Sequence, residues 1–367
     1  MPARKKQHYV PKLYMRGFTD TEKLPSYQLD RRQEFQPTSI HHLCYEDYFY
    51  SDDPEKEEAT MKLEGRFAGV LQDLRNDQTL SALDSEDEWM FLLTFLTHTH
   101  TRTKNAKKES QELSHELLRL WLEANEGVME GDDEEMRQKA LEMLEEEKIQ
   151  IKNTPAFPMG ELVSMYGPLL IGDLEVALLR DVTGMGFIFS DHPVVLDNPM
   201  FQDKIRDAKT GFQTRGIQIF CPISPDLTLM MYDPDCYHIP GTGVVEVGSD
   251  AVTELNRLQI VNALDAVFYQ TEGRESEIRV LHDEVADLRP ENMTQVDWFD
   301  ADDPRFDTDN EVFGIGSTVP DFSPELPFIE SRNAEFDLIR SPEMYARFKS
   351  MIEDARDYAK EQLAQDE

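Results

Sequence analysis

The sequence has few cysteines and no long apolar stretch, and both shortages limit what the protein can be. Three cysteines among 367 residues cannot form the disulfide framework of a small secreted domain. No apolar run approaches the roughly 18 residues that a membrane-spanning helix needs. The basic N-terminus is not followed by the apolar segment of a secretory signal. We therefore expect a cytoplasmic protein that does not associate with membranes.

Basic residues are also scarce. The chain has 37 lysines and arginines against 73 acidic residues, which gives a formal net charge of −36, and the acids are spread over most of its length. A surface rich in carboxylates and poor in lysine stays hydrated in concentrated salt, where self-repulsion is screened. We therefore favour a halophilic protein over an ordinary acidic one. A nucleic-acid mimic is the third alternative, but it would need a compact array of acids, which the sequence does not indicate.

Two short segments run against this acidic background. Residues 1–16 form the first basic segment and residues 98–108 the second, and neither contains an acid. Such segments either hold an anionic ligand at contact distance or pair with carboxylates elsewhere in the fold, and the sequence favours neither strongly. Their basic residues are Arg4, Lys5, Lys6, Lys12 and Arg16 in the first, and Arg102, Lys104, Lys107 and Lys108 in the second.

Hydrophobic periodicity predicts an α+β fold, with a helical N-terminal half packed on a mainly antiparallel sheet. Ser85 and Glu88 form a capping-box pattern, which predicts where the second helix begins. In the third helix, the side chains expected to face inward are Leu113, Leu117, Leu120 and Trp121. The predicted helices cover residues 57–75, 85–108, 110–126, 132–152, 250–264 and 275–288, and the strands 27–30, 174–179, 187–189, 194–196, 217–223, 227–232 and 266–269.

The C-terminal part has a different composition. Residues 1–290 are predicted to form a single α+β core domain. Residues 291–340 carry 13 acids and 3 bases with several prolines and aromatics, which favours an extended arm lying on the core. Residues 341–367 are predicted to form an amphipathic helix, with Ser341 as N-cap and Pro342 in the first turn. This helix is the candidate contact of a homo-oligomer.

Several short motifs are similar to those of a known family. The run at residues 7–11, Gln-His-Tyr-Val-Pro, with Leu13-Tyr14 and Gly17-Phe18, resembles the opening of domain-of-unknown-function family 4238, known for its HYVP motif. Residues 187–194, 221–225 and 255–259 resemble later segments of that family in the same order, so the resemblance covers about residues 6–285. This chain has His192 where the family pattern has asparagine. The family has no established activity, so the resemblance implies an architecture and no function.

One predicted helix carries the clearest geometric signal. Phe91, Phe95, His98 and Arg102 fall on one stripe, which begins as core and ends in an imidazole and a guanidinium. A core-facing arginine must be paired, because an unpaired buried charge is very costly. Arg102, with His98 beside it, is therefore either an anion clamp or the partner of a buried carboxylate such as Glu64.

Three further residues complete the candidate site. His8 is a candidate general base or metal ligand, since a neutral imidazole suits both roles. Lys12 and Arg16 follow it as candidate anion-binding residues. Asp191 stands at the end of an apolar strand and is a candidate catalytic orienter or metal ligand. Each has a structural alternative: a loop-locking histidine for His8 and a turn before proline for Asp191.

Together these residues favour a hydrolase or nuclease-like enzyme acting on a phosphate-bearing substrate, in a defence or mobile-element context, with a divalent cation as candidate cofactor. The alternatives are a non-enzymatic module that binds nucleic acid or protein, and a structural or virion-associated assembly protein. The enzyme hypothesis requires His8, Arg102 and Asp191 to converge on a pocket. An Arg102 sealed against a carboxylate would favour the binding or assembly hypotheses.

Overall fold

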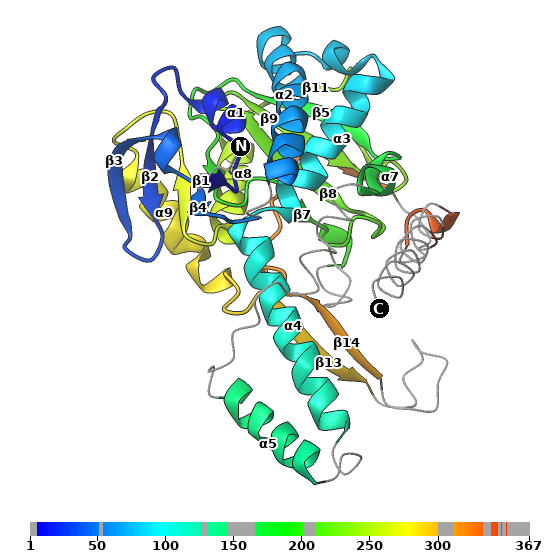
Figure 1. The fold of residues 1–367 in the computed structure, drawn as a ribbon. Helices are drawn as coiled ribbons and strands as arrows, with labels where there is room; N and C mark the ends of the chain where they lie inside the picture. The colour runs from blue at the N-terminus through cyan, green and yellow to red at the C-terminus, as the bar shows by residue number, and fades with distance from the viewer. Residues whose placement is uncertain are drawn as a thin grey trace.

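Two β-sheets, with helices packed between and around them, form the core of the protein in a computed structural model (Figure 1). The structure describes residues 6–50, 54–125, 131–145, 166–201, 210–299, 312–332, 339–343, 346 and 350. The larger sheet has the strand order β11-β5-β9-β8-β7 and the smaller one β3-β2-β12-β6. All neighbouring strands are antiparallel except β11 and β5, which confirms the predicted α+β class.

The strands of the larger sheet follow the predicted apolar runs. They are β5 (Glu175–Asp181), β7 (Val195–Asp197), β8 (Gln218–Ser224), β9 (Leu227–Tyr232) and β11 (Val244–Val247). Strands β8 and β9 are buried along their whole length, because both faces of the sheet are covered. Alternation along β9 sends Leu229 and Met231 into one core cluster and Met230 and Tyr232 into another.

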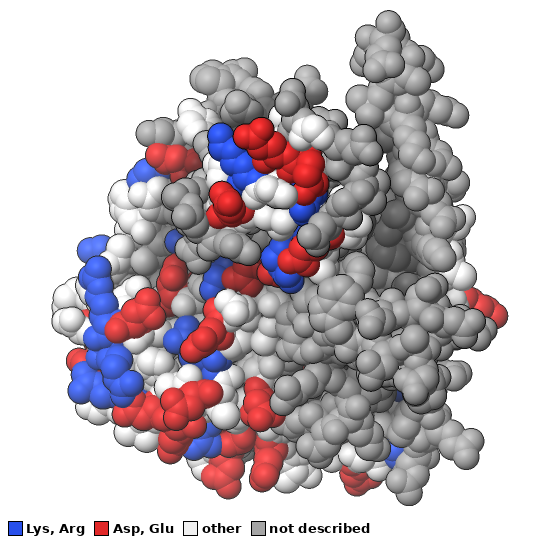
Figure 2. Space-filling view, turned by 90° about the horizontal axis from the view of Figure 1, so that it is seen from below, with Lys and Arg blue, Asp and Glu red and all other residues white. Residues whose placement is uncertain are grey.

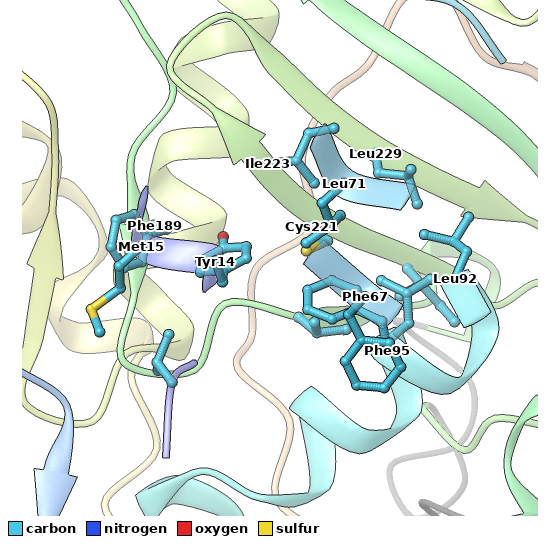
Figure 3. Packing of buried hydrophobic residues seen from close by; sticks show 14 of the residues in the cluster. Tyr14, Met15, Phe67, Leu71, Leu92, Phe95, Phe189, Cys221, Ile223 and Leu229 are labelled. Atoms are coloured by element: carbon cyan, nitrogen blue, oxygen red, sulfur yellow. The ribbon is translucent and has the colours of Figure 1, made fainter. Parts of the chain in front are cut away.

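The first of these clusters lies between the larger sheet and the N-terminal helices. Helices α1 (Lys12–Met15), α2 (Pro54–Asp77) and α3 (Glu86–Thr101) supply Tyr14, Phe67 and Phe95, which pack near Cys221 and Phe189 (Figure 3). The ring centroids of Phe67 and Phe95 are 5.5 Å apart. The predicted apolar face of the 57–75 helix is therefore the face that α2 buries.

The smaller sheet packs on the C-terminal helices of the core. Its strands are β2 (Lys23–Gln28), β3 (Gln33–Ser39), β6 (Phe189–Ser190) and β12 (Ala266–Phe268). Helix α8 (Ser249–Asn262) contributes Leu255 and Leu258 to the cluster on the larger sheet, and Ile260 and Val261 to a third cluster with α9 (Glu275–Val285). Helix α8 therefore joins the two sheets.

The boundary between α3 and α4 (Lys104–Ala124) differs from the prediction. Helix α3 begins after the Ser85 cap, as predicted, but ends at Thr101 instead of continuing to residue 108. It ends there because Thr103 caps α4, its hydroxyl accepting the backbone N–H of Ala106 at 3.3 Å. The break leaves Arg102 between the two helices.

Helix α4 extends away from the sheets, with α5 (Asp132–Glu145) alongside it (Figure 1). The predicted inward positions of Leu117 and Trp121 are wrong, since these side chains are 47% and 54% exposed. Within the part of the chain that the structure describes, no helix has the length and apolarity needed to cross a bilayer.

The segment after residue 290 contains a hairpin that the sequence did not indicate. Strand β13 (Thr294–Phe299) pairs with β14 (Val312–Ser317) beside α4. Farther along, β15 (Glu330–Ser331) pairs with β10 (Tyr237–His238), and Leu326 packs into the cluster on the larger sheet. Helical backbone begins at Pro342, after Ser341. Most of the predicted C-terminal helix lies outside the described residues.

Candidate functional site

The N-terminal motif forms one strand of a short ribbon. Strand β1 (Lys6–His8) pairs antiparallel with β4 (Tyr45–Asp47), so that Lys6 lies opposite Asp47 and His8 opposite Tyr45. Side chains that face each other across such a pair lie on the same side of the ribbon. Lys6, His8, Tyr45 and Asp47 therefore share one side, which we call the outer face.

The inner face of the ribbon packs on the second basic segment. Gln7 is buried, and its side-chain oxygen accepts the backbone N–H of Tyr50 at 2.7 Å. Glu46 lies 3.4 Å from the Nζ of Lys104 and 3.5 Å from that of Lys107. The two basic segments thus meet through a carboxylate.

Arg102 is sealed by internal partners. Its Nη1 lies 2.9 Å from Oε1 of Glu64, its Nε donates to the Tyr50 hydroxyl at 2.7 Å, and its Nη2 donates to the His8 carbonyl at 2.8 Å. Its Nη1 is also 2.8 Å from Nε2 of His98, and the side chain is only 6% exposed. The ion pair with Glu64 that the sequence left open is therefore present, and the guanidinium ties α2, α3 and β1 together.

His98 is held by the same arrangement. Burial, and then the charge of Arg102, lower the pKa of His98 well below its usual range, so the ring is neutral. Its Nε2 can then accept a hydrogen bond from the Arg102 guanidinium. Neither residue presents a free donor to an outside anion in this conformation, so the geometry favours the structural alternative for both.

The lysines of the second basic segment are also paired. Lys104 lies 3.2 Å from Oδ2 of Asp265 in addition to its contact with Glu46. Lys108 lies 3.6 Å from Oε1 of Glu112, one helical turn away. The carboxylates of the fold thus neutralise this segment.

Asp191 is occupied by backbone donors. Its carboxylate accepts the N–H groups of Leu264 at 2.8 Å, Asp265 at 2.6 Å and Ala266 at 3.2 Å. Burial raises the pKa of Asp191 to about 6, and these hydrogen bonds limit the rise. The side chain locks the end of β6 onto the connection between α8 and β12. It interacts electrostatically with Tyr9, whose side chain leaves the ribbon on the side opposite to that of His8.

His192, the departure from the family pattern, lies in a buried contact. Its Nδ1 is 2.7 Å from the Thr103 hydroxyl, and its ring centroid is 4.8 Å from that of His100. Nδ1 of His100 lies 2.9 Å from the Val194 carbonyl. The imidazoles thus connect the α3–α4 junction to the segment between β6 and β7.

Among the predicted site residues, His8 is the one whose side chain keeps a ring nitrogen accessible. Its Nε2 donates to the Ile40 carbonyl at 3.2 Å, which leaves Nδ1 as the acceptor nitrogen. Burial, and then the nearby charge of Lys12, lower the pKa of His8 to about 4, so the ring is neutral at physiological pH. No group in the described residues hydrogen-bonds to Nδ1 of the partly exposed ring.

The cations beside His8 differ from those of the second basic segment. Nζ of Lys6 lies 4.5 Å from the ring centroid of Tyr45 and 3.3 Å from Nδ1 of His42. Neither Lys6 nor Lys12 has a carboxylate within 4 Å among the residues that the structure describes. Arg16 is about half exposed and pairs with Glu22 at 3.1 Å. The described part of the first basic segment, from Lys6 on, is thus only partly neutralised.

The described residues offer no metal centre, because no three of their histidine, cysteine, aspartate or glutamate side chains are placed to hold an ion. The predicted ligands explain this result, since Asp191 is used by backbone amides and His8 lies on the other side of the ribbon. The candidate divalent cation therefore has no cluster of protein ligands in this part of the chain.

Comparison with known families matches residues 6–273 to the family described as "Protein of unknown function (DUF4238)". The chain belongs to this family. The match begins at the first residue of β1, and it confirms the resemblance to this family. No curated protein and no solved structure gave a significant match.

The surface of this DUF4238 protein does not resemble a continuous acidic array in the view of Figure 2. Among the described residues on this face, lysines and arginines are interspersed with the acids, and one group of basic residues gathers at an edge. A nucleic-acid mimic would need uninterrupted acid, so this face does not support that alternative.

Sequence reasoning missed part of the site. Tyr45 comes next to His8, and His42 next to Lys6, only because β4 pairs with β1 across nearly forty residues. Their signal was a histidine pair followed by tyrosine at 41–45, which is weak without the pairing. Lys6 was assigned to the basic segment, but its position on the outer face was not predictable.

Proposed function

We propose that this DUF4238 protein binds a phosphate-bearing ligand on the outer face of the β1–β4 ribbon, around His8. One observation carries the proposal. Lys104, Lys107 and Lys108 all have carboxylate partners, whereas Lys6 and Lys12 have none within 4 Å in the described residues. In a chain of net charge −36, two ammonium groups near one imidazole, neither paired with a carboxylate of the described residues, can contact an anion from outside.

The electrostatics of His8 support this proposal. After burial, the largest influence that lowers the His8 pKa is the charge of Lys12, followed among charged groups by His41 and Arg102. The local potential at the ring is therefore positive, although the protein as a whole is strongly negative. A phosphate placed there would supply the missing negative charge at contact distance, where salt screens it least.

The binding hypothesis fits the geometry better than the predicted hydrolase or nuclease-like activity. Arg102 is sealed and Asp191 is fully occupied, so neither is free to clamp or orient a substrate. Hydrolysis stays a second candidate because of one feature: Nδ1 of neutral His8 has no hydrogen-bond partner among the described residues and carries the lone pair that a general base needs.

Calorimetric titration with pyrophosphate tests the binding proposal. Lys12→Gln and Lys6→Gln should each weaken binding several-fold, because each removes one of the positive charges that would attract the anion. Lys62→Gln is the matched control, since Lys62 is exposed and paired with Glu58. Equal affinity in all four proteins, or no binding by the wild type, would refute the proposal.

A hydrolysis assay separates the second candidate. His8→Gln removes the basic nitrogen but keeps a side chain that can donate to Ile40. If the protein is a hydrolase, this variant should lose turnover of a phosphodiester while still binding pyrophosphate. Binding without any turnover in the wild type would leave the non-enzymatic module as the function.

We further propose that the protein works in a salt-rich cytoplasm. The supporting features are the net charge of −36 and the scarcity of lysine. The midpoint of thermal unfolding should rise markedly between low and molar KCl, and a flat or falling response would contradict the proposal. Self-association through residues 341–367 is a separate proposal. A truncation at residue 340 that leaves the number of subunits per particle unchanged would exclude it.

A further inference from the structure

Aromatic and imidazole rings gather beside Lys6 on the outer face. The Tyr45 ring lies 5.8 Å from that of His8 and 6.4 Å from that of His42, measured between centroids. His42 is exposed and Tyr45 is partly exposed. Tyr48, directly after β4, is 49% exposed and has a φ of 52°, a conformation that a bulky residue rarely adopts.

From this arrangement we infer that the ligand of the outer face is a short stretch of single-stranded nucleic acid. The inference rests on the proposed phosphate-binding function and names its substrate class. Proteins that bind single strands combine cations that contact the backbone with aromatic rings on which bases stack. Lys6 and Lys12 supply the cations, and Tyr45 and His42 supply the rings. Inorganic phosphate alone would make no use of the rings.

The dimensions and charges of the site favour a single strand over a duplex. Strand β1 has three residues, so the ribbon extends for only about 10 Å. A duplex carries one charge per roughly 1.7 Å of its axis, and it would place many phosphates against the acidic remainder of the protein. A flexible strand can contact the two lysines and turn away from that surface. Its bases stay unpaired and can reach the rings.

The number of contacts sets the expected salt dependence. For single strands the logarithm of the binding constant falls with the logarithm of salt by about 0.7 for each phosphate neutralised. Two lysines predict a slope near −1.4, which is about a sevenfold loss of affinity for a fourfold rise in salt. Lys12→Gln should halve this slope.

The experiment titrates the full chain with a labelled twelve-nucleotide oligothymidylate and, separately, with pyrophosphate. We expect the oligonucleotide to bind more tightly. Tyr45→Leu should weaken it about tenfold, as expected for the loss of one stacked base, whereas pyrophosphate, which has no base to stack, should lose much less affinity. Tyr45→Phe should retain the affinity because it keeps the ring.

Two further variants control for folding and for nonspecific effects. His42→Ala changes an exposed ring, so it tests stacking if Tyr45→Leu does not fold. Trp121→Leu removes an exposed ring at the far end of α4, roughly 25 Å along the helix from Lys104, and should have no effect. If pyrophosphate binds but the oligonucleotide binds no more tightly, or if Tyr45→Leu and His42→Ala leave its affinity unchanged, the inference fails and the proposed function stands. If neither ligand binds, both fail.

Discussion

Replacing Arg102 by methionine separates a structural arginine from a ligand clamp. The side chain is 6% exposed and its donors reach Glu64, Tyr50 and the His8 carbonyl. Methionine keeps much of the volume but removes all of these hydrogen bonds. It also leaves the Glu64 carboxylate, which is 25% exposed, without its partner.

The expected loss of stability is large. Breaking a buried ion pair by removing one partner costs about 3–5 kcal/mol. In a chain of this size, each kcal/mol lost lowers the unfolding midpoint by about 2 °C. The expected fall in the midpoint is therefore roughly 6–10 °C. Glu64→Gln should cost less, because the amide oxygen still accepts from Arg102. In a double-mutant cycle the two changes should be strongly non-additive.

Differential scanning calorimetry with purified variants measures this effect. Arg119→Gln is the control, since Arg119 forms a partly exposed pair with Glu116 and Glu123 whose loss should cost no more than about 1 kcal/mol. If Arg102→Met has the wild-type midpoint but no longer binds phosphate, Arg102 is a clamp and the structural assignment is wrong.

Two other perturbations test the packing and the buried histidines. Gly17→Ala should destabilise the fold by about 1–3 kcal/mol, because the added methyl would lie 2.4 Å from both Arg75 Nη2 and the Ile223 carbonyl oxygen. Denaturant unfolding measures this loss, and a variant with wild-type stability would contradict the close packing at Gly17. Burial lowers the pKa of His98 and His192 well below 6.5, so the unfolded chain binds more protons as the pH falls below 6.5. Stability in molar salt should therefore drop between pH 7 and pH 5, by at most about 2 kcal/mol for each histidine. His192→Gln should reduce the drop, and an undiminished drop would contradict a neutral, buried His192.

Local patterns in the sequence predicted most of the core elements. Strand β9 has the predicted bounds, and α3 begins at the predicted cap, because a buried apolar run and a capping serine act over a few residues. The α3–α4 boundary was wrong since Thr103 competes to start a new helix. The β13–β14 hairpin was not predicted, because β13 mixes polar and apolar residues, two glycines interrupt β14, and the strands take their pairing from each other and from α4.

The candidate site was predictable only in part. The helical spacing placed His98 and Arg102 on one face, because helix geometry is regular. The cost of burying an unpaired charge then called for a carboxylate partner, for which Glu64 was only one example. It could not show that Tyr50 and the His8 carbonyl complete the set, since these contacts depend on long-range folding. The occupation of Asp191 by three backbone amides depends likewise on how β6 meets the connection after α8.

The most direct test of phosphate binding at the outer face is the titration of His8 itself, followed by NMR in labelled protein. Without ligand, the pKa of His8 should be about 4. With saturating pyrophosphate it should rise, because a bound anion stabilises the imidazolium, while the buried ring of His192 should not respond. Binding that leaves the His8 pKa unchanged would place the ligand elsewhere and contradict the proposed function.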